Sequence, residues 1–543
     1  MLIFHPKILD AFKGYNRGLL TKDVLSGITV GIVALPLAMA FAIASGLKPE
    51  AGIFTAIVAG GLISLLGGSR VQIGGPAGAF IVIVYGIVER YGIPNLLLAT
   101  AMSGVFLFLM GLMRLGTLVR FIPIAVIIGF TNGIACLIGI SQIKDFFGLT
   151  VEKMPAQFFP MLQTLYAAAD TVNIVALGIA CFSLMIIVAW KLIQKKLGWL
   201  GHIPGTVVAM VIATLITGLF NLPVDTIGSR FGGIPSSLPH FEWISISWGT
   251  AQYMVTPALT LALLGAIESL LCARVADSLI HDRHDSNQEL MAQGVANLVS
   301  PFFGGMPATG TIARTVTNIE SGGTTPIAGI VHACSLLIII LFAAPLAKDI
   351  PLASLAAILM FVAWNMGEWR KFIDLKQFRL PYQLTILSVF TLTVILDLTI
   401  AVQVGLLFAF ITFIYRISSL SRCEQADTQQ YPALENHQGR IDAYRIYGAI
   451  FFGAVKLLEK IEENLPTQTL LLDLKNVIYV DTSGMDTIME LTHLCKMRNI
   501  KLIICGLDHQ PLEMAERSGF LEKLPRDCFC PDLYSGIELA THA

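Results

Sequence analysis

Residues 304 to 318 read GGMPATGTIARTVTN, a polar, glycine-containing stretch between two strongly apolar regions. A similar interruption occurs much earlier in the chain, in VQIGGPAGAFIVIVYG (71 to 86), where a Gly-Gly pair and a proline precede an apolar run too short to cross a bilayer alone. The two stretches lie at corresponding places in the two halves of the apolar region. The fold has to explain why both halves are broken in the same way.

The composition predicts a membrane protein. Of the 543 residues, 55% are hydrophobic and 13% are charged, whereas roughly one quarter is charged in soluble domains. Apolar runs recur along the first 420 residues, and the alternating pattern of barrel strands is absent, so they are predicted to be helices. We expect about fourteen segments, several of them short or broken at glycine and proline.

The distribution of basic residues predicts the topology. The first apolar segment lacks a small-residue cleavage site, so it is interpreted as a retained span. Basic residues precede this segment and then collect at every second junction. By the positive-inside rule, both termini are expected in the cytoplasm. The basic residues before the first segment are Lys7, Lys13, Arg17 and Lys22.

Several functional classes are not supported by the sequence. A net charge of −1 argues against a nucleic-acid partner. The nine cysteines have no metal-type or redox-type spacing and imply no disulfide framework. HDRHD (281 to 285) is interpreted as a charged loop, and Cys528 with Cys530 does not predict a metal site. With no phosphate-binding loop and no nucleophile beside a base, we predict no enzyme, no cofactor and no metal.

The character of the chain changes near residue 420. SRCEQADTQQYPALENHQGR (421 to 440) is polar and without period, which predicts a linker over 420–440 behind a membrane domain at 1–419. Residues 441–543 then alternate strand-like and helix-like runs, the pattern of a small α/β domain. This domain is expected in the cytoplasm.

Each interrupted stretch predicts a half-helix that starts near the middle of the membrane. Pro76 and Pro307 preset the approach to the first turn, whose N–H groups have no partner within the helix. Two facing helix starts supply about +1 elementary charge, and Arg314 would raise the local charge to about +2 if its side chain stayed nearby. Such a field suits an anion, including a dianion. A single interruption would have a structural interpretation as a kink or packing site, but two in matched halves favour a binding site.

Glu268 lies in the middle of an apolar helix, ALTLALLGAIESLLCARVAD (258 to 277). Placing a carboxylate in the middle of a membrane helix costs about 2.5 to 3.5 kcal/mol of insertion free energy, so the side chain should face a cavity or an interacting group. One interpretation is structural: Glu268 pairs with Arg314 or caps a helix start. The other is a proton carrier, because an ionised Glu268 about 6 Å from a dianion would be repelled by about 5 kcal/mol at an effective dielectric of 20. Protonation and anion binding would then favour each other, as proton symport requires.

Three motifs resemble the SulP, or sulfate permease, family of anion transporters. They are PLAMAFAIASGLKPEAGIFTAIVAGGLISLLGGSRVQIGGPAGAF (36 to 80), LLGAIESLLCA (263 to 273) and GGMPATGTIARTVTNIESGGTTPIAG (304 to 329). The resemblance covers essentially the whole chain. LMFVAWNMGEWRK (359 to 371) is most similar to the bacterial C4-dicarboxylic acid transporter branch.

The resemblance implies an all-α membrane domain of two inverted repeats of seven segments. Segments 1 to 4 and 8 to 11 would form a core, and segments 5 to 7 and 12 to 14 a gate. It also implies a homodimer in the bacterial inner membrane, with the anion between the half-helices of segments 3 and 10. Carried over residue by residue, the anion site would use Phe41, Ala77, Gly78, Ala79, Phe80, Gly310, Thr311, Ile312, Ala313 and Arg314.

Two of these positions bear on the transported ions. Prestin-like relatives have serine at the position of Ala313, so this chain lacks a hydroxyl there but keeps the backbone N–H. Sodium-coupled bicarbonate relatives carry aspartate at the position of Glu268 and hydroxyls at those of Cys272 and Ile312. Because sodium prefers oxygen ligands, a thiol and an alkyl group disfavour sodium coupling and favour protons.

The carboxy-terminal domain resembles the STAS domain through LDLKNVIYVDTSGMDTIMEL (472 to 491). In related anti-sigma factor antagonists the residue after the aspartate is phosphorylated, which implies Thr482 and a regulatory protein partner. The alternative is that Thr482 and Ser483 cap the following helix.

The expected function is secondary active transport of sulfate-like anions or C4-dicarboxylates such as succinate, coupled to protons. Anion exchange, sodium-independent bicarbonate transport, a passive anion channel and a sensor acting through STAS remain as alternatives. Sulfate and succinate are both dianions, so charge does not separate them.

Overall fold

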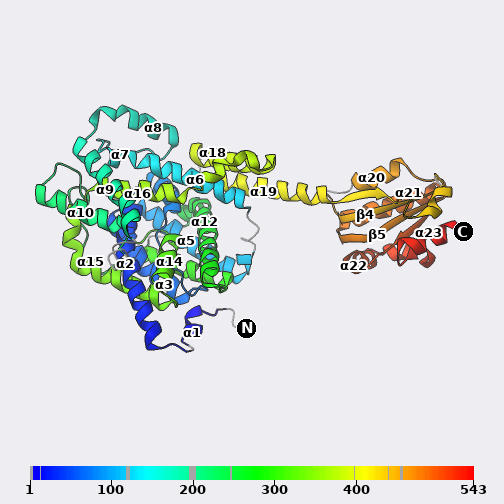
Figure 1. The fold of residues 1–543 in the computed structure, drawn as a ribbon, viewed down its shortest axis with the longest axis horizontal. Coiled ribbons are helices and arrows are strands. Elements are labelled where there is room, and N and C mark those ends of the chain that lie inside the picture. The colour runs from blue at the N-terminus through cyan, green and yellow to red at the C-terminus, as the bar shows by residue number, and fades with distance from the viewer. Residues whose placement is uncertain are drawn as a thin grey trace. The chain divides into compact units, whose positions relative to one another are not determined.

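The computed structural model describes residues 4–12, 14–117, 123–194, 203–244, 247–396, 398–427, 429–437, 439–452 and 456–542. The chain divides into two compact units, Met1–Leu406 and Leu407–Ala543 (Figure 1). The first contains the apolar helices and the second a mixed sheet with helices. Each unit is described by itself.

The described part of the apolar region contains two series of seven helices, which confirms the predicted all-α membrane domain. Seven of the helices are individually long and apolar enough to cross a membrane. The first series is α2 (Arg17–Ala44), α3 (Pro49–Leu66), α4 (Ile81–Tyr91), α5 (Ile93–Leu112), α6 (Ile124–Ser141), α9 (Ile174–Ile193) and α10 (Gly205–Phe220). The second is α12 (Trp248–Ile280), α13 (Ser286–Val299), α14 (Ile312–Glu320), α15 (Ile327–Ala343), α16 (Leu352–Met366), α18 (Leu380–Ile395) and α19 (Leu398–Leu420).

Short helices connect or precede these elements. They are α1 (Lys7–Ala11), α7 (Ile143–Phe146), α8 (Phe158–Ala167), α11 (Ile227–Phe231) and α17 (Trp369–Ile373). The third member of each series, α4 and α14, is the half-helix predicted after the Gly-Gly stretches.

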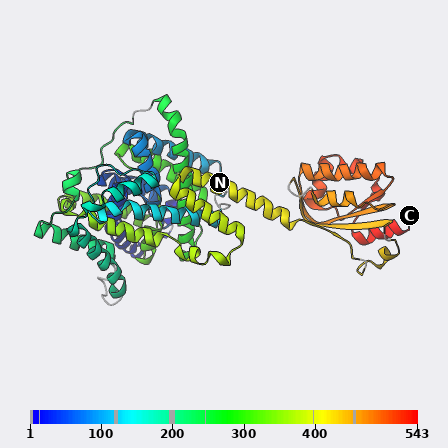
Figure 2. The same ribbon diagram turned by 90° about the horizontal axis from the view of Figure 1, so that it is seen from above.

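The membrane helices pack in two groups, each with members from both series. Helices α2, α3, α5, α12, α13 and α15 pack on one another, with α4 and α14 attached to them, while α6, α9, α10, α16 and α18 form the second group. In both views, first-series helices in blue lie among second-series helices in green (Figures 1 and 2). The two groups correspond to the expected core and gate.

Glycine allows the core helices to approach at backbone distance. A Cβ on Gly52 of α3 would lie 1.9 Å from the Ala38 carbonyl oxygen of α2. A Cβ on Gly104 of α5 would lie 2.4 Å from the Leu298 backbone nitrogen of α13. Such small-residue contacts are how membrane helices gain dispersion energy without a hydrophobic driving force.

Two short strands join the broken segments. β1 (Gly74–Gly75) pairs antiparallel with β2 (Thr309–Gly310), with Gly74 opposite Gly310 and Gly75 opposite Thr309. All four residues are buried. Non-helical backbone at membrane depth is tolerated only where protein satisfies its hydrogen bonds, and here each strand satisfies the other.

The second unit holds a five-stranded sheet in the order β3-β4-β5-β6-β7, parallel except for the β3–β4 pair. Helices cover both faces, because Ile488 of α21 packs with Leu472 on one side and Ile537 of α23 packs with Leu471 on the other. The strands are β3 (Arg422–Gln425), β4 (Ile441–Ile450), β5 (Thr469–Val480), β6 (Lys501–Cys505) and β7 (Phe529–Cys530). The helices are α20 (Lys456–Glu463), α21 (Thr482–Met497), α22 (His509–Arg517) and α23 (Leu533–Thr541).

The stretch 420–440, predicted as a linker, is partly built into this sheet. β3 is its antiparallel edge strand, and the Ala426 backbone N–H donates to the Ala443 carbonyl at 2.8 Å. Leu434 is buried with 4% of its surface exposed. The polar sequence concealed the strand because an edge strand exposed on most of its residues needs no alternating apolar pattern.

We predict that Gly52→Val destabilises the membrane unit by about 1 to 3 kcal/mol, the usual cost of an overpacked contact. The new side chain would collide with the Ala38 carbonyl, which belongs to rigid helix backbone. Thermal unfolding of the purified protein in detergent measures the effect. Gly178→Ala on α9 is the control, because a Cβ there meets nothing within 4 Å; equal midpoints for the two variants would contradict the close α2–α3 contact.

Candidate functional site

The start of α14 is attached to the segment that precedes β1. The Thr311 backbone N–H donates to the Ile73 carbonyl at 2.9 Å, and its hydroxyl donates to the same oxygen at 3.1 Å. The Ile73 N–H in turn donates to Thr315 Oγ1 at 3.0 Å. Together with the β1–β2 pair, these bonds join the two segments that lead into the half-helices α4 and α14.

The predicted residues of the α4 side surround its first turn. Ala77, Gly78, Ala79 and Phe80 are all buried. A Cβ on Gly78 would lie 3.5 Å from Phe41 Cε1. Phe80 packs on α12, because a Cβ on Gly265 would lie 3.4 Å from Phe80 Cζ. The structure therefore brings Phe41 close to Gly78 at the start of the half-helix, while Phe80 packs toward α12; both were predicted as residues of the anion site.

The residues of the α14 side separate into two faces. Gly310 and Thr311 are buried, while Ile312 and Ala313 at the first turn are exposed, Ile312 by 42%. Arg314, one residue further around the helix, is only 1% exposed. The arginine thus points to the buried side of α14, away from the exposed side chain of Ile312.

The Arg314 guanidinium lies against the first strand rather than over the exposed helix start. A Cβ on Gly75 would lie 2.1 Å from Arg314 Nη1. Neither Nη1 nor Nη2 has a hydrogen-bond partner within the described residues. Its charge therefore acts on the helix starts from behind the paired strands β1 and β2. This geometry does not put Arg314 in direct contact with an anion bound at Ile312 and Ala313.

Helix α12 presents one face to the paired strands β1 and β2, which we call the crossing. The Gly265 carbonyl accepts a hydrogen bond from Thr309 Oγ1 at 3.1 Å, and the Ser269 carbonyl accepts one from Gln72 Nε2 at 3.3 Å. Gly265 and Ser269 are one turn apart, so this face points at β1 and β2.

Glu268 lies on the same face of α12. It is adjacent to Ser269, three residues after Gly265 and four before Cys272, whose Sγ donates to Thr315 Oγ1 at 3.3 Å. Glu268 is half-buried, and its Oε2 is buried with no hydrogen-bond partner in the described part of the chain. No ion pair or hydrogen bond joins it to Arg314 among those residues, so the proposed structural pairing of the two is not found.

The sequence analysis missed several polar and apolar residues of this region. Met366, at the end of the gate helix α16, lies 3.7 Å (Sδ) from a Cβ placed on Gly78. Gln72, Thr309 and Thr315 hold the crossing in place through the bonds described above. A polar residue directly before a Gly-Gly pair was an available signal for Gln72, but nothing in the sequence around Met366 indicated proximity to Gly78.

The candidate regulatory residue of the second unit is not a helix cap. The cap of α21 is Asp481, whose Oδ1 accepts from the Gly484 N–H at 2.7 Å. Thr482 is the first helical residue, and both Thr482 and Ser483 are exposed. The expectation that Thr482 or Ser483 caps the helix was therefore wrong, because the preceding carboxylate already occupies that position.

Comparison with known proteins decides the family. Residues 20–389 match the Sulfate permease family, and residues 431–537 match the STAS domain. The chain belongs to the sulfate permease family. It is therefore a multi-span membrane protein of a family of anion transporters, not of enzymes, and it carries a carboxy-terminal STAS domain.

Relatives and solved structures agree with this assignment. The chain is 41% identical over 95% of its length, and 97% of the relative's, to a Bacillus subtilis (strain 168) protein named "Putative sulfate transporter YvdB". It is 30% identical to the bicarbonate transporter BicA of Picosynechococcus, covering 93% and 92% of the two chains. The transmembrane domain of a cyanobacterial BicA superposes with a TM-score of 0.64 at 31% identity, over 72% of this chain and 98% of that one.

A more distant structure shows that the whole architecture is shared. The structure of SLC26A9 has a TM-score of 0.89 over 98% of this chain and 92% of that chain, at 18% identity. At that identity the likeness concerns the fold, which is the predicted combination of a membrane domain and an α/β domain. Within the described residues no group of histidine, cysteine and carboxylate side chains is arranged to hold a metal ion.

We predict that Asp481→Ala destabilises the start of α21 by about 1 kcal/mol, the usual value of an N-cap. Thr482→Ala should have little effect, since Thr482 does not cap the helix. Hydrogen exchange of the first α21 amides in the intact protein measures both, with exchange about five-fold faster expected for Asp481→Ala alone. Equal exchange rates in the two variants would refute the assignment of the cap.

Proposed function

We propose that the protein is a secondary active transporter of a small dianion, with sulfate as the first candidate and C4-dicarboxylates such as succinate as the second. The observation that carries this proposal is the pairing of β1 with β2, which joins the two segments that lead into α4 and α14. First-turn N–H groups have no intrahelical acceptors and can donate to an anion. Ala77, Gly78 and Ala79 on one side, and Gly310, Ile312 and Ala313 on the other, are the proposed binding residues. Thr311 is proposed to line the site without donating to the anion, because its N–H and its hydroxyl both donate to the Ile73 carbonyl.

Electrostatics supports a dianion. Two helix starts contribute about +1 charge, and Arg314 adds a full charge behind the strands without touching the ligand. Burying an arginine without a nearby negative charge costs free energy. A dianion bound on the other side of the glycine backbone would provide that negative charge. The relative at 41% identity is named as a putative sulfate transporter, which supports the same class of substrate.

The surroundings of Gly78 support a dehydrated site. Phe41 of α2 and Met366 of the gate helix α16 approach Gly78, and Phe80, directly before α4, packs toward Gly265 of α12. Apolar walls exclude water and strengthen the attraction between the anion and the N–H groups. Because Met366 belongs to the gate, movement between core and gate would open or close this wall.

Proton coupling through Glu268 is part of the proposal. Its Oε2 is buried and unpartnered on the helix face that carries the contacts to β1 and β2. A negative charge held there without a partner is costly and would repel a dianion, and binding a proton removes both penalties. Proton and anion would therefore bind together.

Bicarbonate is the third candidate substrate, supported by the 30% identity to BicA. Sodium coupling fits this chain poorly. The Cys272 thiol already donates to Thr315 Oγ1, which also accepts from the Ile73 N–H, and Ile312 offers only an alkyl group. Sodium would thus lack the oxygen ligands that it prefers.

We further propose a bacterial inner-membrane homodimer with both termini and the STAS domain in the cytoplasm. The basic residues at alternate junctions support this orientation. The exposed Thr482 hydroxyl at the start of α21 is accessible to a kinase and to a regulatory protein. A phosphate there would lie at a helix N-terminus, which favours negative charge.

We expect proteoliposomes containing the purified protein to accumulate labelled sulfate against its gradient when an inward proton gradient is imposed. Uptake of labelled succinate and bicarbonate under the same conditions ranks the substrate classes. Uptake that ignores pH but requires anion on the opposite side would identify an exchanger, and uptake that never exceeds equilibrium would identify a channel. Either result would overturn symport.

We expect Glu268→Gln to abolish proton-driven accumulation while anion exchange at equilibrium continues. Glutamine resembles the protonated carboxyl in size and neutrality but cannot release a proton. Counterflow and pH-jump uptake measure the two activities separately. Glu320→Gln, at the exposed end of α14, is the control and should leave both unchanged; a variant at Glu268 with normal pH dependence would return this residue to a structural role.

A further inference from the structure

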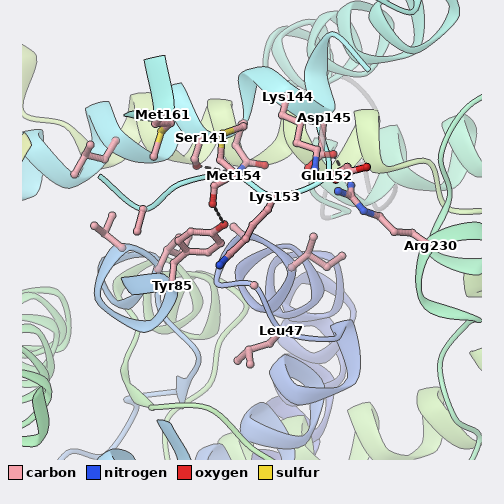
Figure 3. Close-up of a pocket in the computed structure, with 18 of the residues that line it drawn as sticks. Leu47, Tyr85, Ser141, Lys144, Asp145, Glu152, Lys153, Met154, Met161 and Arg230 are labelled. Carbon is pink, nitrogen blue, oxygen red and sulfur yellow. Dashed lines mark hydrogen bonds and ion pairs between the residues drawn. The ribbon is translucent and has the colours of Figure 1, made fainter. Parts of the chain in front are cut away.

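Two hydrogen bonds connect the half-helix α4 of the core to a loop of the gate. The Tyr85 hydroxyl donates to the Met154 carbonyl, and the Ala156 N–H donates to Glu89 Oε2 at 3.0 Å. Tyr85 and Glu89 are one turn apart and share a face of α4. Figure 3 shows Tyr85 pointing from its helix to Met154 on the loop. We call this pair of bonds the outer contact.

The loop of the outer contact is fixed to the gate on its other side. The Lys144 ammonium of α7 donates to the Val151 carbonyl at 2.7 Å, and the Thr150 N–H donates to Thr171 Oγ1 at 3.0 Å. Because one end of the loop is held by gate elements, the bonds from Tyr85 and Glu89 transmit the position of the gate to α4.

Cavities border the outer contact. One cavity of about 240 Å³ reaches Tyr85, Met154 and the first turn of α4 at Ile81 and Val82 (Figure 3). A second, of about 390 Å³, reaches Ala156 and the far end of α4 at Tyr91. The cavities reduce the packing between α4 and the gate, so the two hydrogen bonds carry more of that attachment.

The outer contact lies toward one face of the membrane. Helix α2 begins at Arg17 and ends at Ala44, and the first cavity is lined by residues from its end, Ile43 to Leu47. We call the membrane face at which α2 ends the far face. The cavity thus lies between the far face and the start of α4, on a route that an anion could take to the site.

We propose that Tyr85 and Glu89 are positioning residues of the transport cycle, which hold α4 against the gate and keep the site closed to the far face. The proposal rests on alternating access of the anion site, as secondary active transport requires. To open toward the far face, core and gate must separate along α4, and both hydrogen bonds must break. The ring of Tyr85 also packs in the apolar cluster with Met154 and Met161, so removing only its hydroxyl leaves the packing in place.

The population of the far-open state sets the apparent affinity measured from that face. If the structure is the favoured closed state, losing one hydrogen bond should raise the far-open fraction by about five-fold, given the usual net strength of such a bond. Apparent affinity rises in proportion to the competent fraction. The KM for anion presented at the far face should therefore fall about five-fold, with no such fall at the other face.

The test compares Tyr85→Phe and Glu89→Met with wild type in proteoliposomes, with labelled sulfate offered at one face at a time. Orientation is determined from protease cleavage of the carboxy-terminal unit. Glu89→Gln retains an acceptor oxygen for the Ala156 N–H and should behave as wild type. Tyr91→Phe, at the exposed end of α4, is the matched hydroxyl control and should leave both KM values unchanged.

The results distinguish the positioning role of Tyr85 and Glu89 from the proposed transport function. A far-face KM that falls in Tyr85→Phe and Glu89→Met but not in the two controls supports the positioning role. Unchanged KM values at both faces, or equal changes at both, would overturn it, whether or not the melting temperature falls. Absence of labelled anion transport by wild type would instead refute the proposed function, which the positioning role presupposes.

Discussion

The structure depends on a pair of backbone strands placed inside a membrane protein. Four residues, Gly74 and Gly75 with Thr309 and Gly310, pair across more than two hundred residues of chain. Without that pairing their N–H and C=O groups would be buried and unsatisfied, at a cost of several kcal/mol for each group. The pairing makes it possible for both chain halves to interrupt a helix at depth, each just before a half-helix begins.

The residues around the crossing meet its geometric demands. Glycine is required where the strands approach other groups, since a Cβ on Gly310 would lie 1.5 Å from Gln72 Nε2 and one on Gly74 2.3 Å from Ile63 Cδ1. Side-chain hydroxyls and amides then bind the remaining backbone groups, as Thr309 does with the Gly265 carbonyl. The same arrangement puts the face of α12 that carries Gly265 and Ser269 against the paired strands, with Glu268 next to Ser269 in the chain. In the proposed mechanism, the anion field and the proton carrier would both derive from this local structure.

Charge is distributed unusually around this centre. Arg314 is fully buried without a hydrogen-bond partner in the described part of the chain, and Glu268 Oε2 is buried and unpartnered too. Within the described residues, neither side chain forms an ion pair or a hydrogen bond with the other. On the gate side, the outer contact joins Tyr85 and Glu89 of α4 to a loop, and Met366 of α16 approaches Gly78 just before α4. Gate residues therefore contact this half-helix and the segment before it at separate places.

The sequence by itself determined the class of the protein and its division into a membrane region and an α/β region, since both follow from composition and from the period of apolar residues. It also located the two half-helices, because Gly-Gly and proline interrupt an apolar run at matched places in the two halves. It failed at the edge strand β3, whose exposed side chains carry no alternating pattern, and at the cap of α21, where Asp481 and not Thr482 or Ser483 binds the backbone. Only the tertiary structure decided which way Arg314 points, that Glu268 is unpaired with it, and that Met366 and Met154 approach α4. Those facts depend on contacts between residues far apart in the chain, and local periodicity holds no information about them.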